Sequence, residues 1–135
     1  MKTELIADTW SALGETQREF VEAFYGRFFA RFPIYRPLFP KQLDAGHLEK
    51  MVQTMALVAN LAEDRSLIAP HMRKVGHAHS AYHLSPSDLD NFKSVFVEML
   101  GERLGSRWNR EAERAWEQAF DQVLIPLMQK GLSGG

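Results

Sequence analysis

The sequence predicts a single all-α domain. Apolar residues recur at steps of three and four over most of the chain, which is the spacing of amphipathic helices. Sustained period-two alternation and Asn-Gly or Asp-Gly hairpin turns, which would indicate strands, do not occur in the sequence. The length of 135 residues corresponds to one domain at roughly 150 residues per domain.

Two helices are predicted at the start of the chain. A short first helix spans residues 3–13 and stops at Gly14. The second begins at Thr16, which has the spacing of a capping box with Glu19. The apolar stripe of this second helix consists of Phe20, Val21, Phe24, Tyr25, Phe28 and Phe32.

Pro33 ends the second helix, because proline disfavours helix at the residue before it and has no N–H to donate. Residues 33–39 then form a short helical turn that closes at Pro40, and a long third helix follows a break at residues 44–46. One stripe of the third helix is expected to carry His47, Met51, Met55 and Val58.

A fourth helix has a stripe with steps of four, three, four and three, made of Ile68, Met72, Val75, His79 and Tyr82. Ser85, Pro86 and Asp88 then form a helix start, with proline in the first turn and an acid three residues past the cap. The helix they open ends at Gly101 or Gly105, and its inward face consists of Leu89, Phe92, Phe96 and Met99.

The last predicted helix spans residues 109–130, and Pro126 should cost it a backbone hydrogen bond or bend it. Its buried face consists of Trp116, Phe120, Val123, Leu124 and Leu127. Six or seven helices with short connections result, over a domain of residues 1–131 and a disordered tail at 132–135.

Composition excludes several classes of protein. Sixteen Lys and Arg against seventeen Asp and Glu give a net charge of −1, which argues against nucleic acid as the main partner. Without cysteine, the chain has no disulfide, thiolate metal site or thiol nucleophile. No apolar run approaches the roughly 18 residues of a membrane span, and Asp8 follows after three apolar residues, so no signal-peptide core is present. We therefore expect a cytoplasmic protein without a membrane partner.

Common catalytic motifs (GxGxxG, the P-loop, HExxH and GxSxG) are missing, so the histidines are the informative residues. His47 and His79 fall on apolar stripes of two different helices. Burying imidazole among apolar side chains is unfavourable unless its nitrogens find partners. Two interpretations follow. Each of the two is a core histidine bonded to a backbone carbonyl, or both face a shared ligand between the helices. A flat apolar cofactor with a metal centre would suit the many Phe and Met residues as well as the imidazoles.

Zinc is a rival for these histidines. His79 and His83 are four residues apart and share a helical face, whereas His77 lies about 200° round the helix. No acidic residue or cysteine is placed to complete a set of three or four zinc ligands. The sequence therefore disfavours zinc, with His83 expected at a helix end and His77 in solvent.

The ordered spacing of these residues resembles the globin family, in particular bacterial single-domain globins and the globin domain of flavohaemoglobins. The segment at residues 24–29 (Phe-Tyr-Gly-Arg-Phe-Phe) is similar to the second-helix motif of that family, in which Tyr25 takes the aromatic position on the distal side. Pro33 matches the start of the third helix, and Phe39 matches the phenylalanine that wedges against the haem ring.

The second half of the chain carries the same resemblance. Residues 75–82 (Val-Gly-His-Ala-His-Ser-Ala-Tyr) are similar to the proximal motif, Ser85-Pro86 to the next helix start, and residues 116–120 to the last helix. The resemblance implies a globin fold of six to seven helices around a pocket for haem b (iron protoporphyrin IX). His79 would be the proximal iron ligand, with its other nitrogen held by a carbonyl near Val75. Tyr82, in the same motif, would contact the haem.

On the distal side, the resemblance implies that Tyr25 donates a hydrogen bond to bound O₂, which carries partial negative charge. The alternative is a core tyrosine bonded to a carbonyl. His47 has three open roles: a second donor to the gas, a sixth ligand on iron, or a side chain turned to solvent. Phe39 and Met51 would pack on the haem, and Lys50 would either reach a propionate or remain solvated.

Two departures from the flavohaemoglobin pattern bear on function. Those proteins carry a Tyr and a Glu behind the proximal histidine, and this chain has Leu89 and Gln129 at the corresponding positions. Without an anionic partner the iron receives less electron density, which favours reversible O₂ binding over peroxide-type chemistry. The chain also ends with the globin, so any turnover would need a separate reductase.

The sequence thus predicts a haem protein that reversibly binds O₂ and other diatomic gases (NO and CO) at ferrous iron, as a monomer or homodimer. One alternative is a nitric oxide dioxygenase that works with a separate reductase. The other is a haem-free helical interaction or sensory module that only keeps the fold.

Overall fold

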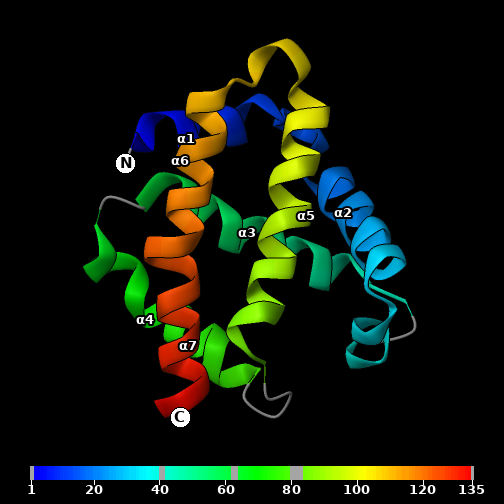
Figure 1. Cartoon of the computed structure of the whole chain (residues 1–135), viewed down its shortest axis with the longest axis vertical. Helices are drawn as coiled ribbons and strands as arrows, with labels where there is room; N and C mark the ends of the chain where they lie inside the picture. Colours follow the sequence, from blue (N-terminus) through cyan, green and yellow to red (C-terminus); the bar gives the residue numbers. More distant parts are fainter. Residues whose placement is uncertain (1, 40–41, 62–63, 80–83, 135) are drawn as a thin grey trace.

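The computed structural model is all-helical, as the sequence predicts. The structure describes residues 2–39, 42–61, 64–79 and 84–134, and over these ranges it contains seven α-helices and no strand (Figure 1). The α-helices are α1 (Thr3–Ala12), α2 (Gln17–Arg31), α3 (Ala45–Leu61), α4 (Arg65–Ala78), α5 (Pro86–Leu104), α6 (Arg110–Ala119) and α7 (Ile125–Gly134). Short 3₁₀ segments are η1 (Gly14–Thr16), η2 (Pro33–Leu38) and η4 (Gly105–Arg107), and η5 (Phe120–Leu124) is a π-helix.

The helices cross one another at several angles and do not form a parallel bundle. In Figure 1, α5 and the α6–α7 segment run lengthwise, α1 crosses near one end, and α3 crosses behind them. Helix α4 packs along α7, and α2 contacts both α3 and α5. In the part of the chain that the structure describes, no helix combines the length and the apolar character that crossing a membrane requires.

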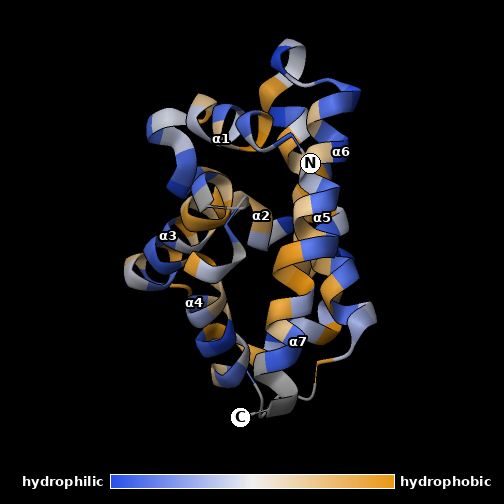
Figure 2. Ribbon diagram, turned by 90° about the vertical axis from the view of Figure 1, so that its left-hand side faces the viewer, coloured by the Kyte–Doolittle hydropathy of each residue, from blue (hydrophilic) through white to orange (hydrophobic). Residues whose placement is uncertain are grey.

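The core is built largely from aromatic rings. Phe96 of α5 is fully buried, and its ring centroid lies 5.4–6.3 Å from those of six other aromatic residues, in α1, α2, α5, α6 and η5. These neighbours are Trp10, Phe20, Phe24, Phe92, Trp116 and Phe120. Figure 2 shows hydrophobic and hydrophilic residues on the same helices, as expected for amphipathic helices around one core.

Two of the predicted helix boundaries are confirmed. Ser85 and Asp88 form a reciprocal capping box at the start of α5, and α5 ends at Gly105, whose φ of +53° favours glycine. The predicted capping box of Thr16 is wrong. Its side chain caps no helix N–H, and its hydroxyl donates to the carbonyl of Leu13, because the chain forms the 3₁₀ turn η1 before α2 begins.

The third helix also begins earlier than predicted, because Ala45 and Gly46 belong to α3. At the C-terminal end, the π-helix η5 comes just before Pro126, and the N–H of Ile125 bonds the carbonyl of Phe120 five residues back. Helix α7 then continues to Gly134.

Candidate functional site

Four rings, from α2, from the residue after η2 and from the first turn of α3, form an aromatic cluster. Tyr25 (α2) lies with its ring centroid 5.7 Å from Phe29, 5.4 Å from Phe39 and 5.7 Å from His47. Phe39 follows η2 and lies 5.0 Å from Phe29, and it lies 5.8 Å from His47 in the first turn of α3. The structure therefore brings together Tyr25 and His47, which the sequence placed on the distal side, and Phe39, which it placed against the haem ring.

Tyr25 supplies a polar group to this cluster, beside the imidazole of His47 and the apolar rings of Phe29 and Phe39. Its side chain is 5% exposed, and burial raises the pKa of its phenol to about 12. The phenol is thus neutral over the physiological range and keeps its proton. A buried hydroxyl of this kind is a hydrogen-bond donor suited to a ligand that enters the cluster.

His47 is half-buried at the start of α3, and its backbone N–H donates to Oδ1 of Asp44 at 2.8 Å. Burial lowers the pKa of its imidazole below the usual value, the charge of Asp44 opposes this, and the electrostatic effects of His79 and Lys50 add to the lowering. His47 is therefore neutral near pH 7.

The orientation of His79 is fixed by its own helix. Its Nδ1 lies 2.7 Å from the carbonyl oxygen of Val75, one turn earlier in α4. A carbonyl oxygen can only accept, so Nδ1 carries the hydrogen, and in the neutral ring the lone pair is on Nε2. An imidazole held in this way is a suitable metal ligand. The expected carbonyl partner at Val75 is confirmed, although α4 ends at Ala78 and His79 caps it.

The remaining predicted site residues are distributed as follows. Met51 lies one turn after His47 in α3 and is partly buried against the core, while the Lys50 side chain is exposed. Leu89 is partly buried near the start of α5, and Gln129 lies on α7, which packs along α4. His77 is exposed, as predicted. Tyr82 and His83 lie outside the described residues.

Sequence reasoning missed two residues of this site, Phe29 and Arg36. Phe29 lies four residues after Tyr25, so helical spacing already placed it on the same face. The guanidinium carbon of Arg36 lies 5.1 Å from the Phe29 ring centroid, and its Nη1 donates to the carbonyl of Phe39 at 3.4 Å. No spacing rule predicts Arg36 as a site residue, because its contact with Phe29 forms only when η2 packs against α2.

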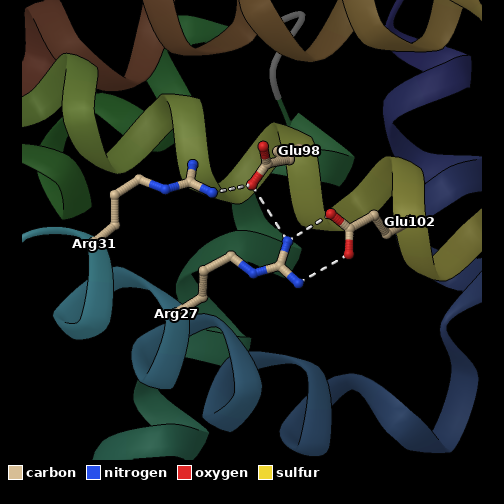
Figure 3. Close-up of polar contacts among 4 residues, drawn as sticks. All are labelled: Arg27, Arg31, Glu98 and Glu102. Carbon is tan, nitrogen blue, oxygen red and sulfur yellow. Dashed lines mark hydrogen bonds and ion pairs between the residues drawn. The ribbon is translucent and has the colours of Figure 1, made fainter.

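Ion pairs to α5 hold the outer face of α2, the helix that carries Tyr25 (Figure 3). Arg27 binds Glu102 with two hydrogen bonds, of 2.6 and 2.9 Å, and also reaches Glu98 at 3.3 Å. Arg31 donates to the same Glu98 oxygen at 2.8 Å. Bidentate Arg–carboxylate geometry and a shared acceptor make this network more directional than an isolated surface pair.

The helical fold, the ring cluster around Tyr25 and the oriented imidazole of His79 define an α-helical protein with a candidate ligand site. Residues 22–126 match the model of the globin family, and the chain belongs to that family. It is 20% identical over 132 residues, 94% of this chain and 91% of the relative, to a protein named anaerobic nitrite reductase NSHB5 from Oryza sativa subsp. indica. The protein of the same name from Oryza sativa subsp. japonica is equally similar. Leghemoglobin 29 of Vicia faba is 20% identical over 137 residues, 93% of each chain.

Proteins of the globin family generally bind haem, and the residues described above fit that group. A flat porphyrin needs apolar and aromatic walls, an imidazole with its lone pair aimed at the iron, and few polar groups on the opposite side. Phe29, Phe39 and Met51 supply apolar surface, His79 supplies the imidazole, and Tyr25 and His47 supply the polar groups. In the described residues, no group of three or more His, Asp and Glu side chains is arranged to hold a bare metal ion.

Proposed function

We propose that this chain binds haem b between α3 and the end of α4, with His79 as the proximal iron ligand, and that it binds O₂ reversibly. Haem supplies ferrous iron, which binds O₂, NO and CO. The observation that carries the proposal is the 2.7 Å contact of His79 Nδ1 with Val75, which directs the Nε2 lone pair away from the helix backbone. Helices α3 and α4, which carry His47 and lead to His79, contact one another.

The chain's own residues have distinct roles in this proposal. Tyr25 donates its phenolic hydrogen to a gas molecule in the distal pocket and slows the loss of O₂, since charge-assisted hydrogen bonds are the strong ones. Phe29, Phe39 and Met51 exclude water. Neutral His47 has three roles open to it: donor to the gas, sixth ligand, or side chain turned to solvent. Exposed Lys50 pairs with a haem propionate or remains in solvent.

Reversible binding is proposed over oxidation chemistry because of the proximal side. Leu89 is partly buried and apolar, and Gln129 is a neutral amide, so neither supplies an anion behind His79. An anionic partner would make the imidazole a stronger electron donor. The similarity to a leghemoglobin is consistent with gas binding. The bacterial single-domain class, a domain end at residue 131 and a cytoplasmic location remain predictions from the sequence.

Nitric oxide dioxygenation is the second candidate, and the buried Tyr25 donor favours it, because retained O₂ is the co-substrate for converting NO to nitrate. A separate reductase would return the iron to the ferrous state. The similarity to proteins named nitrite reductases adds nitrite as a substrate to test. Faster loss of NO with the oxygenated protein and a reductant than with an oxidised control would support nitric oxide dioxygenation. Faster loss of nitrite with the reduced protein than with that control would support nitrite reduction. Equal rates would reject the corresponding activity.

The test of the proposal is an absorption spectrum of the protein purified with haemin. Haem bound at one imidazole gives a Soret band that shifts on reduction and again with CO. A colourless protein that does not bind added haemin would reject the proposal and leave the haem-free helical interaction or sensory module. A stoichiometry of one haem per chain, measured by titration with haemin, is the expected result.

A further inference from the structure

A guanidinium in η2 contacts both phenylalanines of the aromatic cluster. The guanidinium carbon of Arg36 lies 5.1 Å from the centroid of the Phe29 ring, within the roughly 6 Å range of a cation–π contact. Its Nη1 also donates to the carbonyl oxygen of Phe39 at 3.4 Å, and the carbonyl of Arg36 accepts the N–H of Phe39 at 3.2 Å. One half-buried residue therefore binds the ring of one phenylalanine and the backbone of the other.

The two rings that Arg36 joins also pack on Tyr25. Phe29 stacks on the Tyr25 ring with an interplanar angle of 26° and a centroid distance of 5.7 Å. Phe39 meets the Tyr25 ring at an angle of 60° and a centroid distance of 5.4 Å, and the two phenylalanine rings lie 5.0 Å apart. Because closely packed side chains do not shift independently, the positions of Phe29 and Phe39 constrain the ring of Tyr25 and the place of its hydroxyl.

The backbone of Arg36 follows directly after a firmly held residue. Tyr35 is 5% exposed, and its ring stacks on Phe28 of α2 at 4.9 Å with an interplanar angle of 4°. Its hydroxyl donates to Oδ1 of Asp88 in α5 at 2.6 Å and accepts a hydrogen bond from Nδ2 of Asn91 at 2.9 Å. Segment η2 is thus bound to both α2 and α5, and the side chain of Arg36 starts from a fixed backbone.

We propose that Arg36 is a positioning residue for the distal tyrosine. Its guanidinium holds Phe29 and Phe39 together and thereby keeps the Tyr25 phenol in the position from which it donates to a bound gas. The inference rests on the proposed function, in which Tyr25 is the distal donor. The positive charge and the N–H groups are the parts of Arg36 that do this, because an apolar side chain of similar length supplies neither.

Arg36→Met tests the proposal, because it keeps much of the side-chain length and removes the charge and the donors. Arg103→Met is the matched control, since it removes a guanidinium of α5 that pairs at 3.4 Å with Glu19, six residues before Tyr25 in α2. The first readout is amide hydrogen exchange at the Phe39 N–H in the haem-free protein. The second is the dissociation of O₂ and of CO from the ferrous haem protein by stopped-flow displacement. Both arginine variants are also made in a Tyr25→Phe background.

We expect Arg36→Met to speed exchange at Phe39 by roughly three- to tenfold, the scale of losing a cation–π contact or a single hydrogen bond. O₂ dissociation should rise by a similar factor, and CO dissociation should stay nearly unchanged. Arg103→Met should change none of these rates. In the Tyr25→Phe background, Arg36→Met should have no further effect on O₂ dissociation, because its influence passes through the phenol.

Unchanged exchange at Phe39 or an unchanged O₂ rate in Arg36→Met would overturn the proposal, as would equal changes in Arg103→Met. The same acceleration of O₂ loss with and without the Tyr25 hydroxyl would also overturn it, because general loosening of the cluster would then explain the effect. Failure of the proposed function has a different signature. The unmodified protein would then bind no haem, while exchange in the haem-free chain still tests whether Arg36 holds Phe39.

Discussion

The Nδ1 atom of His79 lies 2.7 Å from the carbonyl oxygen of Val75, four residues earlier in the chain. This contact determines which ring nitrogen carries the hydrogen, because the carbonyl has no proton to give. It also ties the imidazole to the last turn of α4, the helix that packs along α7. The orientation of the candidate iron ligand is therefore set by local backbone geometry.

Replacing His79 by Gly should remove the proximal ligand and leave space for a free imidazole. Loss of a supporting interaction lowers the affinity of a metal site roughly 10- to 100-fold. Because His79→Gly removes the ligand itself, we expect the rate of haem loss to rise by more than this factor. Transfer of haem to an acceptor protein, followed by absorbance, measures the rate. Added imidazole should restore retention. The exposed His77→Gly variant is the matched control, and equal haem loss in both variants would point to a different ligand.

Replacing Tyr25 by Phe keeps the buried ring and removes the distal donor. O₂ should dissociate roughly 10- to 100-fold faster, which is the effect of losing a hydrogen bond to a charged acceptor. Carbon monoxide, which accepts less charge, should be released at a nearly unchanged rate. Stopped-flow displacement of each gas gives both rates. Equal O₂ dissociation in the two proteins would show that Tyr25 is a core residue without a role toward the ligand.

Alkaline pH should destabilise the fold through Tyr25. Its pKa of about 12 in the folded chain exceeds the unfolded value near 10. Above pH 10 the unfolded state binds fewer protons than the folded state, so the free energy of unfolding falls as the pH rises from about 10 to about 12. Each pH unit in this window costs about 1.4 kcal/mol. Urea unfolding at several pH values should show a slope that is steeper by this amount in the unmodified protein than in Tyr25→Phe, because Tyr35 and Lys93, whose pKa values are also raised, titrate in both proteins. Parallel curves would contradict the burial of the phenol.

The buried hydroxyl of Thr9 supports the core on which the site rests. It accepts the indole N–H of fully buried Trp116 at 2.8 Å and donates to the carbonyl of Leu5. Thr9→Val keeps the shape and leaves the indole N–H without this acceptor, at a cost of roughly 1–3 kcal/mol in the free energy of unfolding. Ser11→Ala, on an exposed position of the same helix, should stay within about 0.5 kcal/mol. Denaturant unfolding of the two variants measures the difference, and similar values for both would contradict the assignment.

Two helical glycines should respond in opposite directions to replacement by Ala. A Cβ at Gly26 in α2 would meet no atom within 4 Å, so Gly26→Ala should stabilise the fold by about 0.5–1 kcal/mol through backbone entropy. A Cβ at Gly101 in α5 would lie 2.9 Å from the indole nitrogen of Trp108, so Gly101→Ala should destabilise by about 1–3 kcal/mol. Thermal unfolding should separate the two, and shifts of the same sign would contradict the packing of Trp108 on α5.

Sequence patterns predicted the helices well because periodicity and end signals are local. The α2 stripe around Tyr25, the end of α2 before Pro33 and the capping box of Ser85 all follow from residues within one or two turns. The contact of His79 with Val75 has the same origin, since the two residues are one turn apart. Such features need no knowledge of the tertiary arrangement.

What the sequence could not predict depends on residues far apart in the chain. The bond of Tyr35 to Asp88 and the contact of Arg36 with the Phe29 ring arise only when η2 packs against α2 and α5. The failed capping box of Thr16 has a local cause, because the 3₁₀ turn offered its hydroxyl a nearer acceptor at Leu13. A proline in a helix is compatible with a bend of the helix or with a local π-helix before it. Pro126 alone therefore does not predict the π-helix that is observed.

A crystal structure of the protein grown with haemin tests the central claim most directly, because it shows which atom binds the iron. The account predicts Nε2 of His79 bonded to iron, Nδ1 still on the Val75 carbonyl, and the Tyr25 hydroxyl facing the opposite side of the porphyrin. Iron bonded through another residue, or side chains packed together where the porphyrin should lie, would contradict it.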